Sequence, residues 1–139
     1  TGCRFVLTGS TAERGLTAQV SEAARTPLLD LAGQTTLGEF GAVIAGLDLL
    51  LTNDTGASHV AAATQTPSVV LFGPADPRRW APLDSVRHHA INARDCIPGA
   101  DAARALQSLP PEIALEACLQ GLQCESLTTH ATTMQEQVA

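Results

Sequence analysis

Short apolar segments alternate with segments of helical character along the first half of the chain, and this alternation limits the fold more than any other feature. The apolar runs cover residues 4–8, 27–33, 48–52 and 68–72. The segments between them repeat apolar side chains at helical spacing or are rich in alanine, and they cover residues 10–25, 36–48 and 55–64. Continuous apolar strands joined through helices are typical of a parallel sheet that is covered on both faces. The sequence therefore predicts an α/β fold with a Rossmann-like, doubly wound parallel sheet.

This pattern weakens after Pro82, where the sequence predicts only helices. Residues 100–109 are predicted to be helical. Residues 110–122 form a better helix, because prolines open it, Glu112 lies in its first turn and apolar residues follow at helical intervals. Residues 123–139 show little periodicity, so we expect them to form a tail that is loosely ordered or docks on another element.

Composition excludes several classes of partner. The net charge of −6 and the aromatic content of 3% argue against nucleic acid, since proteins that bind it present a basic face and stacking aromatics. The 4 cysteines lack zinc-site spacing, so we expect no metal site and reduced thiols in a cytoplasmic protein. No apolar stretch is long enough to span a bilayer, and the first residues lack the charged segment of a signal peptide.

The segment Asp54-Thr55-Gly56-Ala57 permits two opposite interpretations. Read alone, it is the signature of an aspartic protease, in which two such loops share a proton. That class of protein is mostly β, whereas the residues after Gly56 are rich in alanine and the flanking segments alternate between strand and helix. The sequence therefore favours a turn between a parallel strand and a helix, and the protease remains a remote alternative.

A turn of this kind is suited to hold a phosphate. The first amides of a helix have no partners within the helix and carry the positive end of its dipole. Asp54 or Thr55 can cap the helix, Gly56 leaves room for a phosphate, and Ser58 and His59 offer further donors. Ligands of open α/β sheets lie at the carboxyl ends of the strands, where this turn occurs. A helix that is merely capped, with no ligand, explains the same residues equally well.

A longer stretch carries a resemblance to a known family. Residues 53–83 read NDTGASHVAAATQTPSVVLFGPADPRRWAPL. This segment closely resembles the D-[ST]-G-x-x-H-x-A-A-A…P-x-V-x-L-F-G-P-x-x-P segment of family 9 glycosyltransferases, the ADP-heptose:lipopolysaccharide heptosyltransferases. The similarity runs from about Phe5 to Pro82 and continues more weakly through residues 109–122.

The resemblance implies the carboxy-terminal half of a GT-B glycosyltransferase. Residues 1–122 would then be the domain that binds the nucleotide-sugar donor, without its first strand, and residues 123–139 its tail. The family inverts the sugar's configuration as heptose moves from ADP-heptose to an inner-core acceptor of lipopolysaccharide, and it needs no other cofactor. The acceptor, a lipid-linked glycan, binds the amino-terminal domain, which also supplies the catalytic Asp. We therefore expect this chain alone to be inactive, in the cytoplasm or peripheral to the inner membrane, with a free sheet edge that favours dimerisation.

Some roles carry over residue by residue. Asp54, Thr55, Gly56 and His59 match contacts of the donor's diphosphate and sugar, and His59 would stabilise the departing ADP. Glu13 matches a glutamate that binds the ribose, although with Ser10 it has the spacing of a capping box.

The remaining matches are weaker. Thr35 and Thr36 match the position that lines the adenine pocket, while Thr36 with Glu39 also has the spacing of a helix cap. Gly73 shapes a turn beside the cleft, and Arg78 and Arg79 either meet a phosphate or are simply solvated. A stand-alone nucleotide- or phosphate-binding module is the alternative to the donor half of a transferase.

Overall fold

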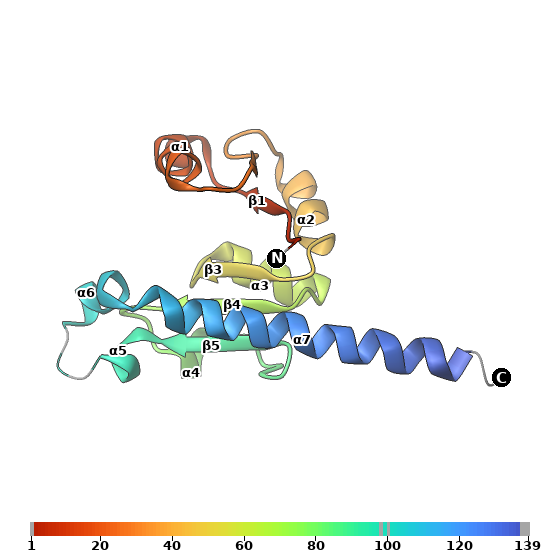
Figure 1. Cartoon of the computed structure of the whole chain (residues 1–139). Coiled ribbons are helices and arrows are strands. Elements are labelled where there is room, and N and C mark those ends of the chain that lie inside the picture. Colours follow the sequence, from red (N-terminus) through yellow and green to blue (C-terminus); the bar gives the residue numbers. More distant parts are fainter. Residues whose placement is uncertain (1, 98, 100, 137–139) are drawn as a thin grey trace. The chain divides into compact units, whose positions relative to one another are not determined.

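The computed structural model describes residues 2–97, 99 and 101–136 (Figure 1). The chain consists of two compact units, Thr1–Val43 and Ile44–Ala139. Each unit contains its own parallel sheet with helices connecting the strands. The α/β class predicted from the alternating pattern is thereby confirmed.

The first unit is built on two short parallel strands. Strands β1 (Phe5–Leu7) and β2 (Leu28–Asp30) pair with Val6 opposite Leu29. The connection between them contains the 3-10 helix η1 (Thr11–Glu13) and helix α1 (Arg14–Ala23). Helix α2 (Leu37–Ala45) follows β2 and begins in this unit.

Gly33 makes the turn after β2 possible. Its φ of +66° is a conformation that side chains rarely adopt, and a Cβ there would lie 2.9 Å from Cα of Thr11. Its amide donates to the carbonyl of Gly9 at 2.8 Å, which ties the segments after the two strands together. The close approach explains why only glycine fits at this position.

The second unit has a three-stranded parallel sheet in the order β3–β4–β5. Its strands are β3 (Leu50–Asn53), β4 (Ser68–Phe72) and β5 (His88–Asn92). Its helices after α2 are α3 (Gly56–Thr64), α4 (Pro77–Trp80), α5 (Ala93–Cys96), α6 (Ala102–Ala105), η2 (Leu106–Ser108) and α7 (Pro111–Glu136).

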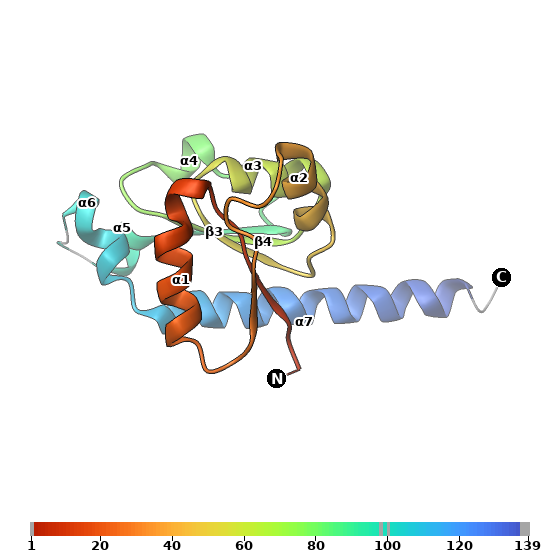
Figure 2. The same ribbon diagram turned by 90° about the horizontal axis from the view of Figure 1, so that it is seen from above.

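Helices cover this second sheet on both faces. Figure 2 shows the strands between α3 on one side and α7 on the other. Val69 of β4 and Ile91 of β5 form a buried cluster with Ala117 of α7. Val70 and Phe72, which alternate with Val69 along β4, are fully buried on the opposite face. The core therefore fixes the turns at both ends of these strands.

One strand and the end of one helix differ from the sequence-based prediction. Strand β5 was missed, because its sequence HHAIN contains two histidines and no continuous apolar run. Helix α7 was predicted to end at residue 122, with a tail after it, but its backbone stays helical to Glu136. The segment after Gly121 contains neither glycine nor proline, so nothing in it ends the helix. Residues 137–139 of the expected tail lie outside the described residues.

The predicted coverage of every strand on both faces is also only partly correct. β4 is buried along most of its length, but Leu29 of β2 and Leu51 of β3 are 56% and 50% exposed. Both side chains belong to strands at the edge of their sheets.

Candidate functional site

The turn between β3 and α3 is held firmly at the carboxyl end of the sheet. The amide of Asp54 donates to the carbonyl of Leu71 in β4 at 3.0 Å. Thr55 is the N-cap of α3 with an extended backbone, and its Oγ1 accepts a long hydrogen bond of 3.4 Å from the amide of Ala57. The sequence left Asp54 and Thr55 as alternative caps, and the structure assigns this function to Thr55.

Ser58 also belongs to the architecture of this turn. Its side chain is fully buried, and its hydroxyl donates to the carbonyl of Thr55 at 2.7 Å. Here the hydroxyl of Ser58 is engaged within the helix, and its predicted contact with a ligand stays a prediction. Its contribution is to fix the first turn of α3.

Three groups at this turn remain available for a ligand. Gly56 borders open space where a Cβ would stand. Its amide, the carboxylate of Asp54 and the ring of His59 have no hydrogen-bond or ion-pair partner within the described part of the chain. His59 is exposed and Asp54 is half-buried. The turn thus combines a helix N-terminus with an unengaged acid and an unengaged imidazole.

Glu13, in contrast, is engaged by its own helix start. Its Oε2 accepts hydrogen bonds from the amide and the hydroxyl of Ser10, both at 2.7 Å. The hydroxyl of Ser10 is the main cause that lowers the pKa of Glu13 below its usual value. The capping box anticipated in the sequence is therefore formed, and the ribose contact of Glu13 stays a prediction.

Thr36 opens α2 in the same manner. Its amide and hydroxyl donate to Oε2 of Glu39 at 2.7 and 2.8 Å, and its amide is the main cause that lowers the pKa of Glu39. Thr35 beside it is half-buried. The cap is thus formed, while the adenine contacts of Thr35 and Thr36 stay predictions.

Gly73, Arg78 and Arg79 follow β4, next to the β3–α3 turn. A Cβ on the buried Gly73 would lie 3.2 Å from Cβ of Leu106, so this glycine is explained by packing. Nη2 of Arg78 lies 2.9 Å from Oδ2 of Asp76. Arg79 is exposed and, among the residues described, has no ion-pair partner.

The predicted site residues fall into two groups. The β3–α3 turn and the segment after β4 follow neighbouring strands of one sheet, so they lie at the same edge. Glu13, Thr35 and Thr36 belong to the other compact unit.

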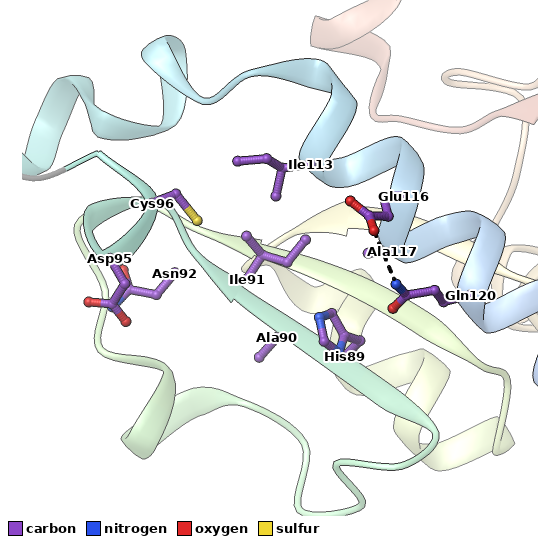
Figure 3. A pocket seen from close by; sticks show the side chains of 10 residues that line it. All are labelled: His89, Ala90, Ile91, Asn92, Asp95, Cys96, Ile113, Glu116, Ala117 and Gln120. Atoms are coloured by element: carbon purple, nitrogen blue, oxygen red, sulfur yellow. Dashed lines mark hydrogen bonds between the residues drawn. The ribbon is translucent and has the colours of Figure 1, made fainter.

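A pocket that the sequence did not predict lies between β5 and α7. It has a volume of about 390 Å³, and Figure 3 shows its lining side chains. Ile91, Ile113 and Ala117 form its apolar floor, and Glu116 accepts a long hydrogen bond of 3.5 Å from Gln120 at its rim. It was missed because strand β5 was missed.

Two further properties concern metals and membranes. No group of three or more His, Cys, Asp or Glu side chains that could hold a metal ion occurs among the residues described. Within the same residues, no helix combines the length and the apolar content needed to cross a membrane.

The comparison with known proteins decides the family. Residues 1–109 match the family described as glycosyltransferase family 9 (heptosyltransferase). The chain belongs to this family. The helix after Gly56 and the parallel strands around it also contradict the remote alternative of an aspartic protease loop.

Several heptosyltransferases are similar to parts of the chain. Over 95 residues it is 33% identical to lipooligosaccharide heptosyltransferase 2 of Haemophilus influenzae, covering 63% of this chain and 28% of that relative. Over 54 residues it is 44% identical to lipopolysaccharide heptosyltransferase 2 of Escherichia coli K12, covering 39% and 16%. The aligned segments thus cover less than a third of the length of these relatives.

Two solved structures share the fold. Escherichia coli ADP-heptose LPS heptosyltransferase II matches with a TM-score of 0.78 and 31% identity, over 90% of this chain and 38% of that one. A family 9 glycosyltransferase from Veillonella parvula matches with a TM-score of 0.72 and 24% identity, over 88% and 37%. These matches confirm the predicted fold class, a Rossmann-like half of a GT-B glycosyltransferase.

Proposed function

We propose that this chain is the donor-binding half of an inverting glycosyltransferase that transfers heptose from ADP-heptose to an inner-core acceptor of lipopolysaccharide. The observation that carries the proposal is the β3–α3 turn, where the Gly56 amide, Asp54 and His59 have no partner among the residues that the structure describes. Membership of family 9 and the names of the similar heptosyltransferases support the choice of donor and acceptor. The donor needs no further cofactor in this proposal.

The turn would act mainly on the leaving group. As the bond between the sugar and ADP breaks, the diphosphate gains negative charge. The Gly56 amide and the positive end of the α3 dipole stabilise that charge. A hydrogen bond donated by His59 to a phosphate oxygen would stabilise it further. Because the charge grows in the transition state, these groups should accelerate the reaction more than they tighten donor binding.

Acceptor binding and the catalytic base are assigned to a part of the enzyme other than residues 1–139. We propose that an amino-terminal domain binds the lipid-linked glycan acceptor and supplies an Asp that deprotonates its hydroxyl, so that this chain alone is inactive. Glu13, Thr35 and Thr36 would contact the nucleoside, and Arg78 or Arg79 a phosphate. A cytoplasmic location beside the inner membrane follows from that acceptor, and dimerisation through a free sheet edge stays a prediction.

The experiment is a transfer assay with the complete protein. ADP-heptose and a heptose-deficient inner-core acceptor are supplied, and the release of ADP and the mass of the product are followed. Transfer that is lost in Asp54→Asn and retained in the exposed control Asp48→Asn supports the proposal. Unchanged transfer in Asp54→Asn contradicts the assignment of the β3–α3 turn as the donor site. Absence of transfer in the unaltered protein contradicts the proposed identity of the donor or of the acceptor.

A further inference from the structure

A second polar site lies at the carboxyl edge of the three-stranded sheet, between the segments that follow β4 and β5. β4 and β5 pair with Phe72 opposite Asn92, so both segments leave the sheet at the same edge. They enclose a pocket of about 690 Å³, and ligand pockets usually span roughly 300–1,000 Å³. Its charged and amide side chains are Asp76, Arg78, Asn92, Arg94 and Asp95.

One wall of the pocket is a closed ion pair. Nε of Arg78 donates to both carboxylate oxygens of Asp76 at 3.1 and 3.2 Å, and Nη2 donates to Oδ2 at 2.9 Å. Oδ1 of Asp76 also accepts from the Arg78 amide at 3.0 Å. The oxygens of Asp76 are therefore occupied, while Nη1 of Arg78 has no acceptor within the described part of the chain.

The opposite wall is organised by Asn92 at the end of β5. Its Oδ1 accepts from the Arg94 amide at 3.2 Å, and its Nδ2 donates to Oδ2 of Asp95 at 3.0 Å. Figure 3 shows Asn92 and Asp95 together at this end of the strand. Oδ1 of Asp95 and the guanidinium of Arg94 have no partner among the described residues. The pocket thus presents unengaged donors and an unengaged acceptor side by side.

The charges in the pocket cancel. Two guanidinium groups, of Arg78 and Arg94, face two carboxylates, of Asp76 and Asp95. The pKa of Arg78 is raised mainly by its hydrogen bond to Asp76, and in small part by the charge of Asp95. A balanced set of charges gives little attraction for a phosphate, which binds best to a positive excess. It suits a neutral ligand whose groups both donate and accept, such as neighbouring sugar hydroxyls.

We propose that this pocket binds a sugar unit through Arg94 and Asp95, with Arg78 as a third contact, which leaves the phosphate contact proposed above to Arg79; the inference rests on the glycosyl transfer proposed above. β3 and β5 are separated by β4, so the end of β5, from which Arg94 and Asp95 follow, lies about two strand spacings, roughly 10 Å, from the end of β3. That separation allows two sources of the sugar. It is either the sugar of the nucleotide donor or a sugar of the glycan acceptor.

The test uses Arg94→Gln and Asp95→Asn in the complete protein, with exposed controls Arg25→Gln and Asp48→Asn. Dissociation constants are measured for ADP-heptose and for ADP, which lacks the sugar, and KM is measured for the acceptor. Loss of one hydrogen bond to a charged group corresponds to about tenfold or more in affinity. If the pocket holds the donor sugar, both variants weaken ADP-heptose by this factor and leave ADP unchanged.

If the pocket holds the acceptor sugar, both variants raise the acceptor KM by a similar factor and leave ADP-heptose binding unchanged. Either result supports a sugar site. Variants that match the controls within twofold for all three measurements overturn the inference while the proposed transfer stands. If the unaltered protein shows no binding of ADP-heptose above a blank without protein, both the sugar site and the proposed transfer are overturned. Failure of the sugar site alone is therefore distinguishable from failure of the proposed function.

Discussion

The two ends of the sheet β3–β4–β5 use their polar side chains in opposite ways. At the amino ends, Ser68 Oγ lies 2.9 Å from Nδ1 of His88, and both side chains are almost fully buried. Nearby, the hydroxyl of Thr66 donates to the carbonyl of Ile44 at 3.0 Å, and Arg87 donates to the carbonyl of Gln65 at 2.9 Å. At the carboxyl ends, Asp54, His59 and Arg94 are left without such partners among the described residues.

This difference separates stability from function within one sheet. A buried polar group contributes to folding only when it is paired, and the amino ends meet this condition. An exposed group that the fold does not engage costs little and is free to contact a ligand. We therefore expect substitutions at the amino ends to change the free energy of unfolding, and substitutions at the carboxyl ends to change activity.

The largest effect is expected for His59→Ala in the complete protein. Removing a group that stabilises developing charge lowers kcat by about 10²-fold or more, while donor affinity changes less. Steady-state kinetics with ADP-heptose measure both quantities. His89→Ala, an exposed histidine of β5, is the matched control. Equal losses in kcat and affinity, or no loss, would contradict the assignment of His59 to the leaving group.

Ser68→Ala should affect folding instead. It leaves Nδ1 of the buried His88 without its partner, which costs about 1–3 kcal/mol of unfolding free energy. Urea unfolding followed by circular dichroism measures this loss, with the exposed Ser85→Ala as control. ADP affinity should stay within twofold of the unaltered protein. A stability equal to that of the control would show that the buried pair contributes nothing.

Thr55→Ala tests a residue that is expected to contribute both to stability and to donor binding. Thr55 caps α3 and also lies beside the unengaged groups, so its removal should reduce both stability and donor affinity. Loss of an N-cap costs about 0.5–2 kcal/mol. Thr55→Ser retains the hydroxyl and should restore both quantities. A variant with unchanged unfolding free energy would mean that the 3.4 Å contact with Ala57 is not a functional cap.

The smallest effect is a dependence of stability on pH that arises from His88. Burial lowers its pKa below the usual 6.5, partly opposed by the nearby charge of Asp84. As the pH is lowered, His88 therefore binds a proton at a higher pH in the unfolded chain than in the folded chain. The free energy of unfolding falls as the pH drops from 6.5 toward the lower pKa of the folded state. Urea unfolding at several pH values should show this slope in the unaltered protein and a reduced slope in His88→Gln. An identical slope in both would contradict it.

The sequence predicted the strands whose burial produces continuous apolar runs, and the helices whose start signals are local. The capping boxes at Glu13 and Glu39 depend on residues three positions apart, so they can be read directly. β5 could not be predicted, because His88 is tolerated in the core only through its pairing with Ser68, 20 residues away. Two other features also depend on the folded geometry: the hydrogen bond from the Ser58 hydroxyl to the Thr55 carbonyl, and the close packing of Gly73 against Leu106.

The resemblance to family 9 identified the β3–α3 turn, but it could not separate unengaged groups from engaged ones. Ser58 and His59 are neighbours in the same motif, yet one is fully buried and the other exposed. In the pocket between the segments that follow β4 and β5, the sequence indicated only Arg78 as a possible ligand contact. Asn92, Arg94 and Asp95 were not indicated, because they end or follow the missed strand.

The central claim is that the β3–α3 turn binds the donor's diphosphate, and an ADP titration of the complete protein followed by amide NMR tests it most directly. AMP, which lacks the second phosphate, is the control. The account predicts that ADP shifts the amides of Gly56, Ala57 and His59 more strongly than AMP does, and leaves Ser68 and His88 unmoved. ADP binding that leaves the first turn of α3 unchanged, or no ADP binding, would contradict it.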